Sequence, residues 1–438
     1  MTYLNRIRNI AIAAAFLLAP TALHAEEQSQ YFPLPSYRVG PYAVGGSSFF
    51  GGYIDYMNLI NIRDGGVNGV KLTWDECETQ YEVEKGVECY ERMKTGKNIA
   101  AFNPFSLGVQ IALLARVPAD KIPIITIAHG MNGTSDGRVF PYLFPLLLTP
   151  MNLESATFNY IGQREGGMEN LKSKKIVVLY HGSPYGKEPI PVTELLAEKY
   201  GFELHNIEVP HPGSDQTAQW LQIRRINPDY ILIRGWGVMN AVAITSAKRI
   251  GFPADKLIGN IWANSEEDAI PAGDAAIGYI STVVHSAGKD FPVVQDIEKV
   301  VYGAGKGNLG DETRIGNVIH NLGVVNGILN VEAIRIAQAN FGQRTLTTEE
   351  VQWGFDHLRL DSDRIAELGA TGLLQPIHVT CADHEGAGAV KFQQWDGTKW
   401  NSISDWVKPD RALTAPLVEA AAQKYAAENN ITPRICTE

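Results

Sequence analysis

The sequence predicts an α/β protein made of two units, each a doubly wound parallel sheet with helices on both faces. Short continuous apolar runs, such as 122–128 (IPIITIA) and 176–180 (IVVLY), are typical of strands that are buried on both faces of a parallel sheet. These runs alternate with segments of helical periodicity, which is the pattern of repeated strand–helix–strand units. The 438 residues also exceed the roughly 100–200 residues of a single domain.

The first part of the chain supplies the elements of the first unit. In chain order we expect a strand at 37–40, a helix at 51–62, a strand at 69–74, a helix at 87–95, a strand at 99–102, a helix at 107–115 and a strand at 122–128. The helix at 51–62 repeats its apolar residues with helical spacing. Gly65 and Gly66 end it, because glycine readily takes the positive-φ conformations found at helix C-termini.

The second part repeats the alternation and then changes. In chain order we expect a strand at 176–180, helix 192–200, strand 229–233, helix 241–250, strands 257–260 and 279–284, a long helix at 318–339, short segments at 377–380, 390–395 and 400–405, and a mildly amphipathic helix at 415–428. The first unit ends near Pro150 and the second begins near Glu154, with no Pro- or Ser-rich linker between them. Short crossings are therefore expected to join the two units.

The first 25 residues have the three-part layout of a secretory signal peptide. Arg6 and Arg8 are positively charged, 10–19 is an apolar run, and Leu23-His24-Ala25 precedes the cleavage point. The apolar run is too short to span a bilayer, which needs about 20 residues. No later stretch is long and apolar enough to do so. We therefore predict that the signal peptide is removed and that the protein is exported and soluble.

Composition and charge exclude several classes of protein. Hydrophobic residues make up 45% and charged residues 20% of the chain, which is ordinary for a globular protein and unlike a disordered or collagen-like one. The formal net charge is −10. Nucleic-acid-binding domains usually carry a basic excess, so no nucleic-acid partner is expected. An acidic surface keeps a protein soluble and unassociated, and we expect a monomer.

The four cysteines predict two disulfide bonds. Cys77, Cys89, Cys381 and Cys436 form an even set in an exported protein. The sequence allows three pairings. We prefer Cys77–Cys89 with Cys381–Cys436, because each of these bonds closes a short loop or fixes a chain terminus. The absence of a CxxC pair argues against a zinc ribbon and against a thioredoxin-type redox site.

The candidate motifs for catalysis, cofactor binding and metal binding are each incomplete or lie in the wrong structural context. The segment 305–310 (GKGNLG) fits GxGxxG but follows no strand, so we interpret it as a loop. The pair His384-Glu385 lacks the second histidine of HExxH, and 181–186 (HGSPYG) lacks GxSxG spacing. The ten histidines are scattered, without carboxylates at ligand spacing. We expect a protein that is not an enzyme and has no cofactor and no metal site.

One segment carries a resemblance to a known family. Residues 60–72 (INIRDGGVNGVKL), with Gly40-Pro41 before them and Asp75-Glu76-Cys77 after them, resemble the periplasmic binding proteins of branched-chain amino acid ABC transporters. That family opens with a strand, a Gly-Pro loop, a helix that ends in a glycine-rich turn, a second strand and an acidic turn. Gly69 allows the reversal of the chain into the second strand.

Later segments follow the order of the same family. Residues 126–130 (TIAHG) fall where the family has a strand that ends in a ligand-binding loop, and Tyr185-Gly186 resembles its next turn. Residues 212–236 also follow the family's order without a gap. The resemblance covers roughly residues 36–407, and the chain is longer than typical members mainly after Trp406.

The resemblance implies a two-lobed fold with three hinge crossings. Lobe 1 would comprise 34–150 plus 285–375, lobe 2 would comprise 151–284 plus 376–408, and 409–438 would form a C-terminal helical extension. A ligand would bind between the lobes, at the carboxyl ends of strands, where free backbone N–H groups point. The lobes would close around it by a hinge motion. The resemblance also implies a periplasmic location and an inner-membrane ABC permease as partner.

The resemblance also supplies a set of candidate ligand-binding residues. These are Phe49, Phe50, Ser106, Ala128, His129, Gly130, Tyr185, Trp236 and Trp262. Ser106 matches a hydroxyl at a helix N-terminus that holds the ligand carboxylate, with a plain N-cap as the alternative. Tyr185 and Trp236 match aromatic positions that line the cleft in lobe 2.

The remaining candidates lie at the ends of two strands. Ala128 and Gly130 match positions whose backbone groups bind ligand. Gly130 lacks the hydroxyl usual there, and His129 either replaces that contact or points into the core. Phe49 and Phe50 follow the first strand and are expected to face the cleft mouth.

The segment 259–264 (GNIWAN) departs from the amino-acid binders of the family, which place an acid there for the ligand ammonium. A desolvated ammonium without a partner would cost on the order of several kcal/mol. The aromatic candidates favour an apolar or aromatic ligand body. We therefore predict a small carboxylate without an amine, either aromatic or another organic acid. A shift of the alignment that brings Glu266 or Glu267 into the site would favour an amino acid or amide instead.

Three functions agree with this reading. The first is a periplasmic solute-binding protein that delivers a small ligand to an ABC permease. The second is a sensory receptor module of the same fold, and the third is an exported α/β enzyme. The lack of a predicted membrane helix argues against the second, and the failed motifs argue against the third. We predict the first.

Overall fold

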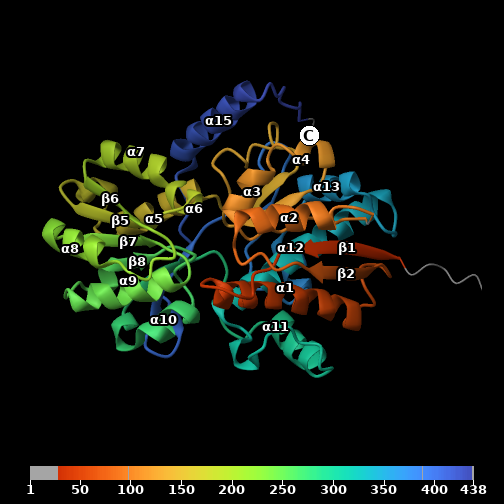
Figure 1. The fold of residues 1–438 in the computed structure, drawn as a ribbon, viewed down its shortest axis with the longest axis horizontal. Coiled ribbons are helices and arrows are strands. Elements are labelled where there is room, and N and C mark those ends of the chain that lie inside the picture. Colours follow the sequence, from red (N-terminus) through yellow and green to blue (C-terminus); the bar gives the residue numbers. More distant parts are fainter. Residues whose placement is uncertain (1–27, 97, 387, 437–438) are drawn as a thin grey trace, which may run out of the picture.

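The computed structural model describes residues 28–436 except 97 and 387, so the predicted signal peptide lies outside the described residues. Figure 1 shows two lobes side by side, each with strands flanked by helices. We call the part around strands β1–β4 lobe 1 and the part around a seven-stranded sheet lobe 2. The predicted α/β class with mostly parallel strands is confirmed. Within these residues, no helix has both the length and the apolarity to cross a membrane.

The strands of lobe 1 form two parallel pairs. β1 (Ser29–Leu34) pairs with β2 (Lys71–Glu76), and β3 (Ile124–Ile127) pairs with β4 (Leu143–Leu146). Single bridges from Tyr31 to Ile99 and from Phe102 to Ile124 connect the two pairs. The predicted strand at 99–102 is thus bridged only at its ends. The predicted strand at 37–40 is wrong, because the chain pairs with β2 earlier, along 29–34.

Among the helices of lobe 1, α1 and α12 pack closely against each other. The helices are α1 (Ala43–Arg63), α2 (Val83–Met93), α3 (Leu107–Leu113), α4 (Val117–Asp120), α11 (Pro292–Asp296), α12 (Val318–Phe341), α13 (Thr348–Asp356) and α14 (Ser362–Glu367). A Cβ atom on Gly52 would lie 2.1 Å from the carbonyl oxygen of His320, so only glycine fits there. Helix α1 therefore begins earlier than predicted, because glycines that disfavour an isolated helix serve here to bring two helices together.

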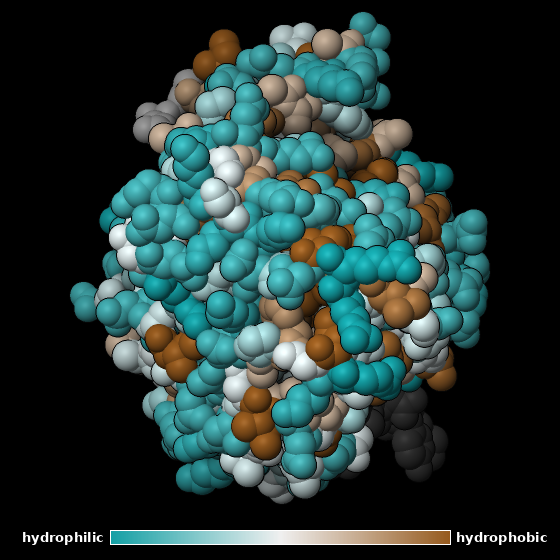
Figure 2. Space-filling model, turned by 90° about the vertical axis from the view of Figure 1, so that its left-hand side faces the viewer, coloured by the Kyte–Doolittle hydropathy of each residue, from teal (hydrophilic) through white to brown (hydrophobic). Residues whose placement is uncertain are grey.

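Lobe 2 is a sheet in the order β13-β12-β9-β8-β7-β5-β6. Its strands are β5 (Lys175–His181), β6 (Glu203–Val209), β7 (Tyr230–Arg234), β8 (Leu257–Gly259), β9 (Ile280–Val283), β12 (Lys391–Trp395) and β13 (Trp400–Ser402). Its helices are α5 (Pro150–Arg164), α6 (Pro184–Lys187), α7 (Ile190–Tyr200), α8 (Thr217–Ile226), α9 (Val238–Arg249) and α10 (Glu266–Ala272). β12 and β13 are antiparallel additions to the parallel strands. The outer face of this lobe is mostly hydrophilic, with small separate hydrophobic patches (Figure 2).

The third passage of the chain between the lobes comes later than expected. The first two passages lie between β4 and α5 and between β9 and α11. The resemblance implies that 376–408 belongs to lobe 2, but β11 (Ile377–His378) pairs with β10 (Arg359–Leu360) of lobe 1. The chain therefore enters lobe 2 only before β12. The backbone N–H of Leu147 donates to the carbonyl oxygen of Glu385 (3.1 Å), which holds the first and third passages together.

Both predicted disulfide bonds are confirmed. Cys77 pairs with Cys89 inside lobe 1, and Cys381 pairs with Cys436 near the C-terminus. The predicted C-terminal helix is also present, as α15 (Arg411–Glu428). Figure 1 shows α15 lying over both lobes, above the junction between them. After β13, the chain thus returns from lobe 2 to lobe 1 through α15 and the residues that lead to Cys436.

Candidate ligand-binding site

Aromatic side chains from both lobes surround a small cavity between them. We call this group the aromatic cage: Tyr37, Tyr81, Phe105, Ser106, Leu107 and His129 from lobe 1, with Tyr185, Trp236 and Trp262 from lobe 2. The cavity measures about 20 Å³, which is room for one water molecule. A ring-sized ligand therefore requires the lobes to part or the cage side chains to rotate. The residues of the cage contain no Asp, Glu, Lys or Arg.

Phe105 lies at the centre of the cage. Its backbone has a φ of 46°, a conformation that non-glycine residues rarely adopt. One face of its ring stacks on Phe49, with centroids 3.7 Å apart. Its edges meet Trp262 and Trp236 of lobe 2, at centroid distances of 5.2 Å and 5.8 Å. An unusual backbone conformation thus carries an aromatic ring from lobe 1 to the surface of lobe 2, as strained residues at functional sites often do.

His129 presents one free nitrogen to the cage. Its Nδ1 lies 2.9 Å from the carbonyl oxygen of Ile127. A carbonyl only accepts hydrogen bonds, so Nδ1 carries the proton. Burial lowers the pKa of His129 to about 4, although the Ile127 carbonyl acts against this shift. The imidazole is therefore neutral at pH 7, and its Nε2 is a buried acceptor without a hydrogen-bond partner.

The polar groups that lobe 2 contributes to the cage differ in whether they have hydrogen-bond partners. The hydroxyl of Tyr185 donates to the carbonyl oxygen of Gly235 (3.1 Å) and accepts from Asn260 Nδ2 (2.7 Å). The indole Nε1–H of Trp236 is buried and has no partner in hydrogen-bond geometry among the described residues, although it lies close enough to the Tyr37 hydroxyl to act on the pKa of that group. Burial raises the pKa of Tyr37 well above its usual range, and the nearby Trp236 indole only opposes this shift. The cage therefore holds one unpaired acceptor, on His129, and one unpaired donor, on Trp236.

The structure brings most of the predicted site residues to this place. Ser106, His129, Tyr185, Trp236 and Trp262 all line the cage, and Ala128 and Gly130 flank His129. Ser106 also caps α3, since its Oγ accepts from Val109 N at 3.5 Å. Phe49 and Phe50 are buried within α1 and lie behind Phe105 and Tyr37, so their expected position at the cleft mouth is wrong. Helix α1 includes them and turns them into the core.

Sequence reasoning missed Tyr37, Tyr81, Phe105 and Leu107 as cage residues. Phe105 and Leu107 flank the predicted Ser106, so the helix N-terminus itself was the signal that could have found them. Tyr37 was assigned to a strand. Tyr81 has a φ of 64° in a loop, which no local pattern indicates.

Glu266 and Glu267 lie between the lobes but outside the cage. Oε1 of Glu267 accepts from Ser48 Oγ (3.0 Å) and pairs with Arg314 Nη2 (2.6 Å), both in lobe 1. Oε2 of Glu266 accepts from the backbone N–H of Val318 (3.0 Å), at the start of α12. These acids therefore hold the lobes together, and the alignment shift that would have placed them at the ligand is not supported.

Three further contacts join the lobes around the cage. Tyr42 Oη and His181 Nε2 are 2.9 Å apart. Asn132 of lobe 1 donates its backbone N–H to Glu188 Oε2 and its Nδ2 to the Glu188 carbonyl oxygen, each at 2.6 Å. A Cβ on Gly45 of α1 would lie 2.4 Å from the Trp236 ring, so the indole is seated directly against lobe 1. The described arrangement is thus a closed one.

Comparisons with known proteins agree with this architecture. A family model described as "Periplasmic binding protein" matches residues 31–399. A crystal structure described as an ABC transporter permease from the Pseudomonas fluorescens group is 48% identical, with a TM-score of 0.88, covering 94% of this chain and 100% of that one. A search of curated proteins finds no match.

Two more distant structures share the fold. A branched-chain amino acid ABC transporter protein from Thermus thermophilus, with bound valine, is 21% identical (TM-score 0.74; 90% of this chain, 99% of that one). A solute-binding protein from R. palustris, in complex with benzoate, is 16% identical (TM-score 0.68; 88% and 97%). Since the family model spans most of the chain and a 48%-identical structure covers 94% of it, this chain belongs to the periplasmic binding protein family.

Proposed function

We propose that this protein is the substrate-binding component of an ABC importer. It captures a small organic carboxylate with an aromatic body and no amine between its lobes, and it delivers this ligand to an inner-membrane permease. It acts in the periplasm as a monomer, after removal of residues 1–25, and it performs no chemistry on the ligand. The observation that carries this proposal is the aromatic cage between two lobes of a binding-protein fold.

The composition of the cage supports the choice of ligand. Six aromatic rings face the cavity, and such rings bury large apolar surfaces and stack on other rings. An α-amino acid would bury its ammonium group beside no carboxylate, because Glu266 and Glu267 are engaged with lobe 1. Such an unpaired charge is costly. A carboxylate would meet Ser106 and the first N–H groups of α3. The benzoate complex of a fold relative is consistent with this class of ligand.

The test is thermal unfolding of the exported protein against aromatic acids, aliphatic acids, amino acids and amides. A ligand at 100 times its Kd stabilises the native state by about 2.7 kcal/mol. We expect a shift in Tm with aromatic acids and none with amino acids. A shift with amino acids alone would leave the importer component in place and overturn the amine-free ligand. Turnover of the bound compound would overturn the transport function.

A further inference from the structure

The unpaired Nε2 of His129 sets a requirement on the ligand. The His129 side chain is 5% exposed and lies between the rings of Phe105 and Trp262, with centroids at 6.0 Å and 5.5 Å. Its Nδ1–H is already donated to Ile127. Buried polar atoms in native proteins nearly always have a partner. Since the described protein supplies none to Nε2, its partner comes from the cavity, which is water in the empty cage and an atom of the ligand when one is bound.

The chemistry of Nε2 determines what that atom is. A neutral imidazole with its proton on Nδ1 offers a lone pair at Nε2, and therefore accepts a hydrogen bond. An ionised carboxylate has acceptors only, so it would be repelled at this position. The Trp236 indole N–H, the other unpaired group, needs an acceptor instead. A ligand that satisfies both groups carries an acceptor at one place and a donor at another.

We propose that the ligand is an aromatic carboxylate that also bears a hydroxyl group, and that this hydroxyl donates to His129 Nε2. This inference rests on the proposed function, because it assumes that the aromatic cage holds the ligand. The carboxylate and the hydroxyl are then recognised by different residues of the cage. His129 is a specificity-determining residue that separates hydroxylated from unsubstituted aromatic acids.

Calorimetric titration of the exported protein with benzoate, meta-hydroxybenzoate and para-hydroxybenzoate tests this inference. We expect at least one hydroxybenzoate to bind about tenfold or more tightly than benzoate, since a site with a buried hydrogen-bonding group rejects analogues that lack the partner. His129→Leu should bring the two affinities together by weakening only the hydroxylated ligand. In His129→Gln the amide oxygen also accepts a hydrogen bond, so this variant should keep part of the preference for hydroxybenzoate over benzoate. That partial preference would also show that the altered site still folds.

The outcomes separate the two proposals. Equal affinities for benzoate and both hydroxybenzoates in the unaltered protein would overturn the role of His129 and leave the aromatic-acid importer intact. A preference that persists in His129→Leu would do the same. Binding of none of the three acids would overturn the aromatic ligand itself, and this inference with it.

A second, independent observation concerns residues 410–436, which we call the C-terminal strap. Its start is bound to lobe 2: the backbone N–H of Asp410 donates to Ser155 Oγ (2.9 Å), and Thr414 Oγ1 donates to Asn152 Oδ1 (2.5 Å). Its later part is bound to lobe 1. There Tyr425 packs on Phe140, with centroids 4.8 Å apart, and Ala422 and Ala426 are buried.

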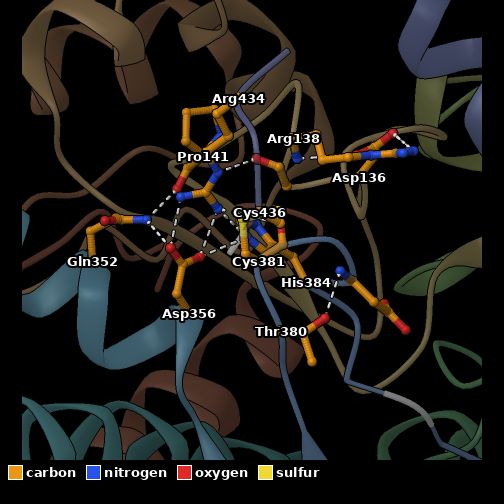
Figure 3. The surroundings of a disulfide bond; sticks show 12 residues. Asp136, Arg138, Pro141, Gln352, Asp356, Thr380, Cys381, His384, Arg434 and Cys436 are labelled. Carbon is orange, nitrogen blue, oxygen red and sulfur yellow. Dashed lines mark hydrogen bonds and ion pairs between the residues drawn. A yellow bond between two sulfur atoms is a disulfide. The ribbon is translucent and has the colours of Figure 1, made fainter. Parts of the chain in front are cut away.

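The end of the strap is fixed to lobe 1 most firmly. Figure 3 shows Arg434 against Asp356, close to the Cys381–Cys436 disulfide. Its two terminal nitrogens lie 2.7 Å and 2.8 Å from the Asp356 oxygens. Burial alone would raise the pKa of the Asp356 carboxyl, but His384 and the Arg434 guanidinium lower it to about 2. The strap therefore joins the lobes in addition to the three chain passages.

We infer that the strap is a tether that limits how far the lobes open. A segment bound at both ends across a hinge restricts rotation about it. Small-angle X-ray scattering of the ligand-free protein tests this, with Cys381→Ser, Cys436→Ser and Arg434→Ala combined to release the end on lobe 1. We expect a larger radius of gyration in this variant. Cys77→Ser with Cys89→Ser is the matched control, because that disulfide lies within lobe 1.

A radius of gyration that stays equal in the released variant and the control would overturn the tether. A folding check uses the released variant with its two lobes crosslinked in the closed form. If the variant is folded, its radius of gyration should equal that of the unaltered protein crosslinked in the same way. An equal expansion in both disulfide variants would show loosening of lobe 1 rather than opening, and would also overturn it.

Discussion

The two lobes meet along two seams that are held in different ways. At the cleft seam, noncovalent contacts alone join the lobes: the aromatic cage, Tyr42 with His181, and Glu267 with Arg314. At the hinge seam, the backbone itself crosses between the lobes, and the strap and a disulfide lie over it. Side-chain contacts are individually weak and reversible, whereas backbone and disulfide connections are permanent. The permanent connections therefore lie at the hinge seam, and the reversible contacts lie at the cleft seam.

A buried carboxylate shows how closely the hinge seam is packed. Glu385 Oε1 accepts from the backbone N–H of Thr149 (2.7 Å) and from Asn152 Nδ2 (2.9 Å), where the first passage leaves lobe 1. Arg411, at the start of α15, lies 3.4 Å from Glu385 Oε2. Burial still raises the pKa of Glu385 to about 7, against the effect of Arg411. Chain passage and strap are therefore joined by one polar cluster.

The largest predicted effect is on stability at the hinge seam. Opening the Cys381–Cys436 bond, which spans 55 residues, should lower the free energy of unfolding by about 4 kcal/mol in the chain-entropy account, against about 3 kcal/mol for Cys77–Cys89, which spans 12. Urea unfolding of the paired Cys→Ser variants measures both values. A smaller loss for Cys381–Cys436 would show that the strap stays in place without its disulfide, and would weaken the contrast between the seams.

The next effect is on binding at the cleft seam. Trp236→Ala removes a ring that contacts Phe105 and Gly45 of the opposite lobe and Trp262 of its own lobe. We expect a loss of ligand affinity on the order of 100-fold, or about 2.7 kcal/mol, with little change in the Tm of the ligand-free protein. Trp353→Ala, in α13 away from the cage, is the control and should leave affinity unchanged. A large drop in Tm without loss of affinity would mean that Trp236 serves packing.

The sequence predicted the permanent parts of the molecule better than the reversible ones. Both disulfides and most buried strands follow from local patterns of apolar residues and cysteines. β6 was missed because its sequence ELHNIEV alternates with polar residues, as at the edge of a sheet. Phe105 and Tyr81 were missed because their positions depend on positive-φ backbone and on contacts made only when the lobes meet. Such contacts join residues far apart in sequence.

A smaller effect concerns pH, because carboxylates at the cleft seam change their pKa on closure. Burial, with Glu267 nearby, raises the pKa of Glu266 to about 8, and burial raises that of Glu188 to about 7. In an open form both would return toward about 4.3. The closed form therefore binds more protons, and closure should be favoured as pH falls from 8.5 to 6.5. We expect ligand affinity to rise on the order of tenfold over this range.

The histidines act in the opposite direction only at lower pH. Burial lowers the pKa of His129 and of His181 to about 4 in the closed form, whereas their ordinary pKa is about 6.5. Above pH 6.5 both are therefore mostly neutral whether the lobes are open or closed. Below that value, closure is opposed by their protonation. Glu266→Gln with Glu188→Gln should flatten the profile between pH 8.5 and 6.5, whereas Glu349→Gln, at an exposed position of α13, should leave it unchanged. A flat profile in the unaltered protein would mean that these acids are already neutral when the lobes are open.

The smallest predicted effect separates two roles of one hydroxyl. Ser106 Oγ caps α3 through a long 3.5 Å contact to Val109 N, and the same side chain faces the cage. Loss of the cap in Ser106→Ala should cost about 1 kcal/mol of stability, and loss of a ligand contact should weaken binding about fivefold to tenfold. Ser106→Gly retains most of the cap's stability but no hydroxyl. Weak binding by both variants, with a lower Tm only for Ser106→Ala, would assign the hydroxyl to the ligand. Normal binding by Ser106→Gly would assign it to the helix alone.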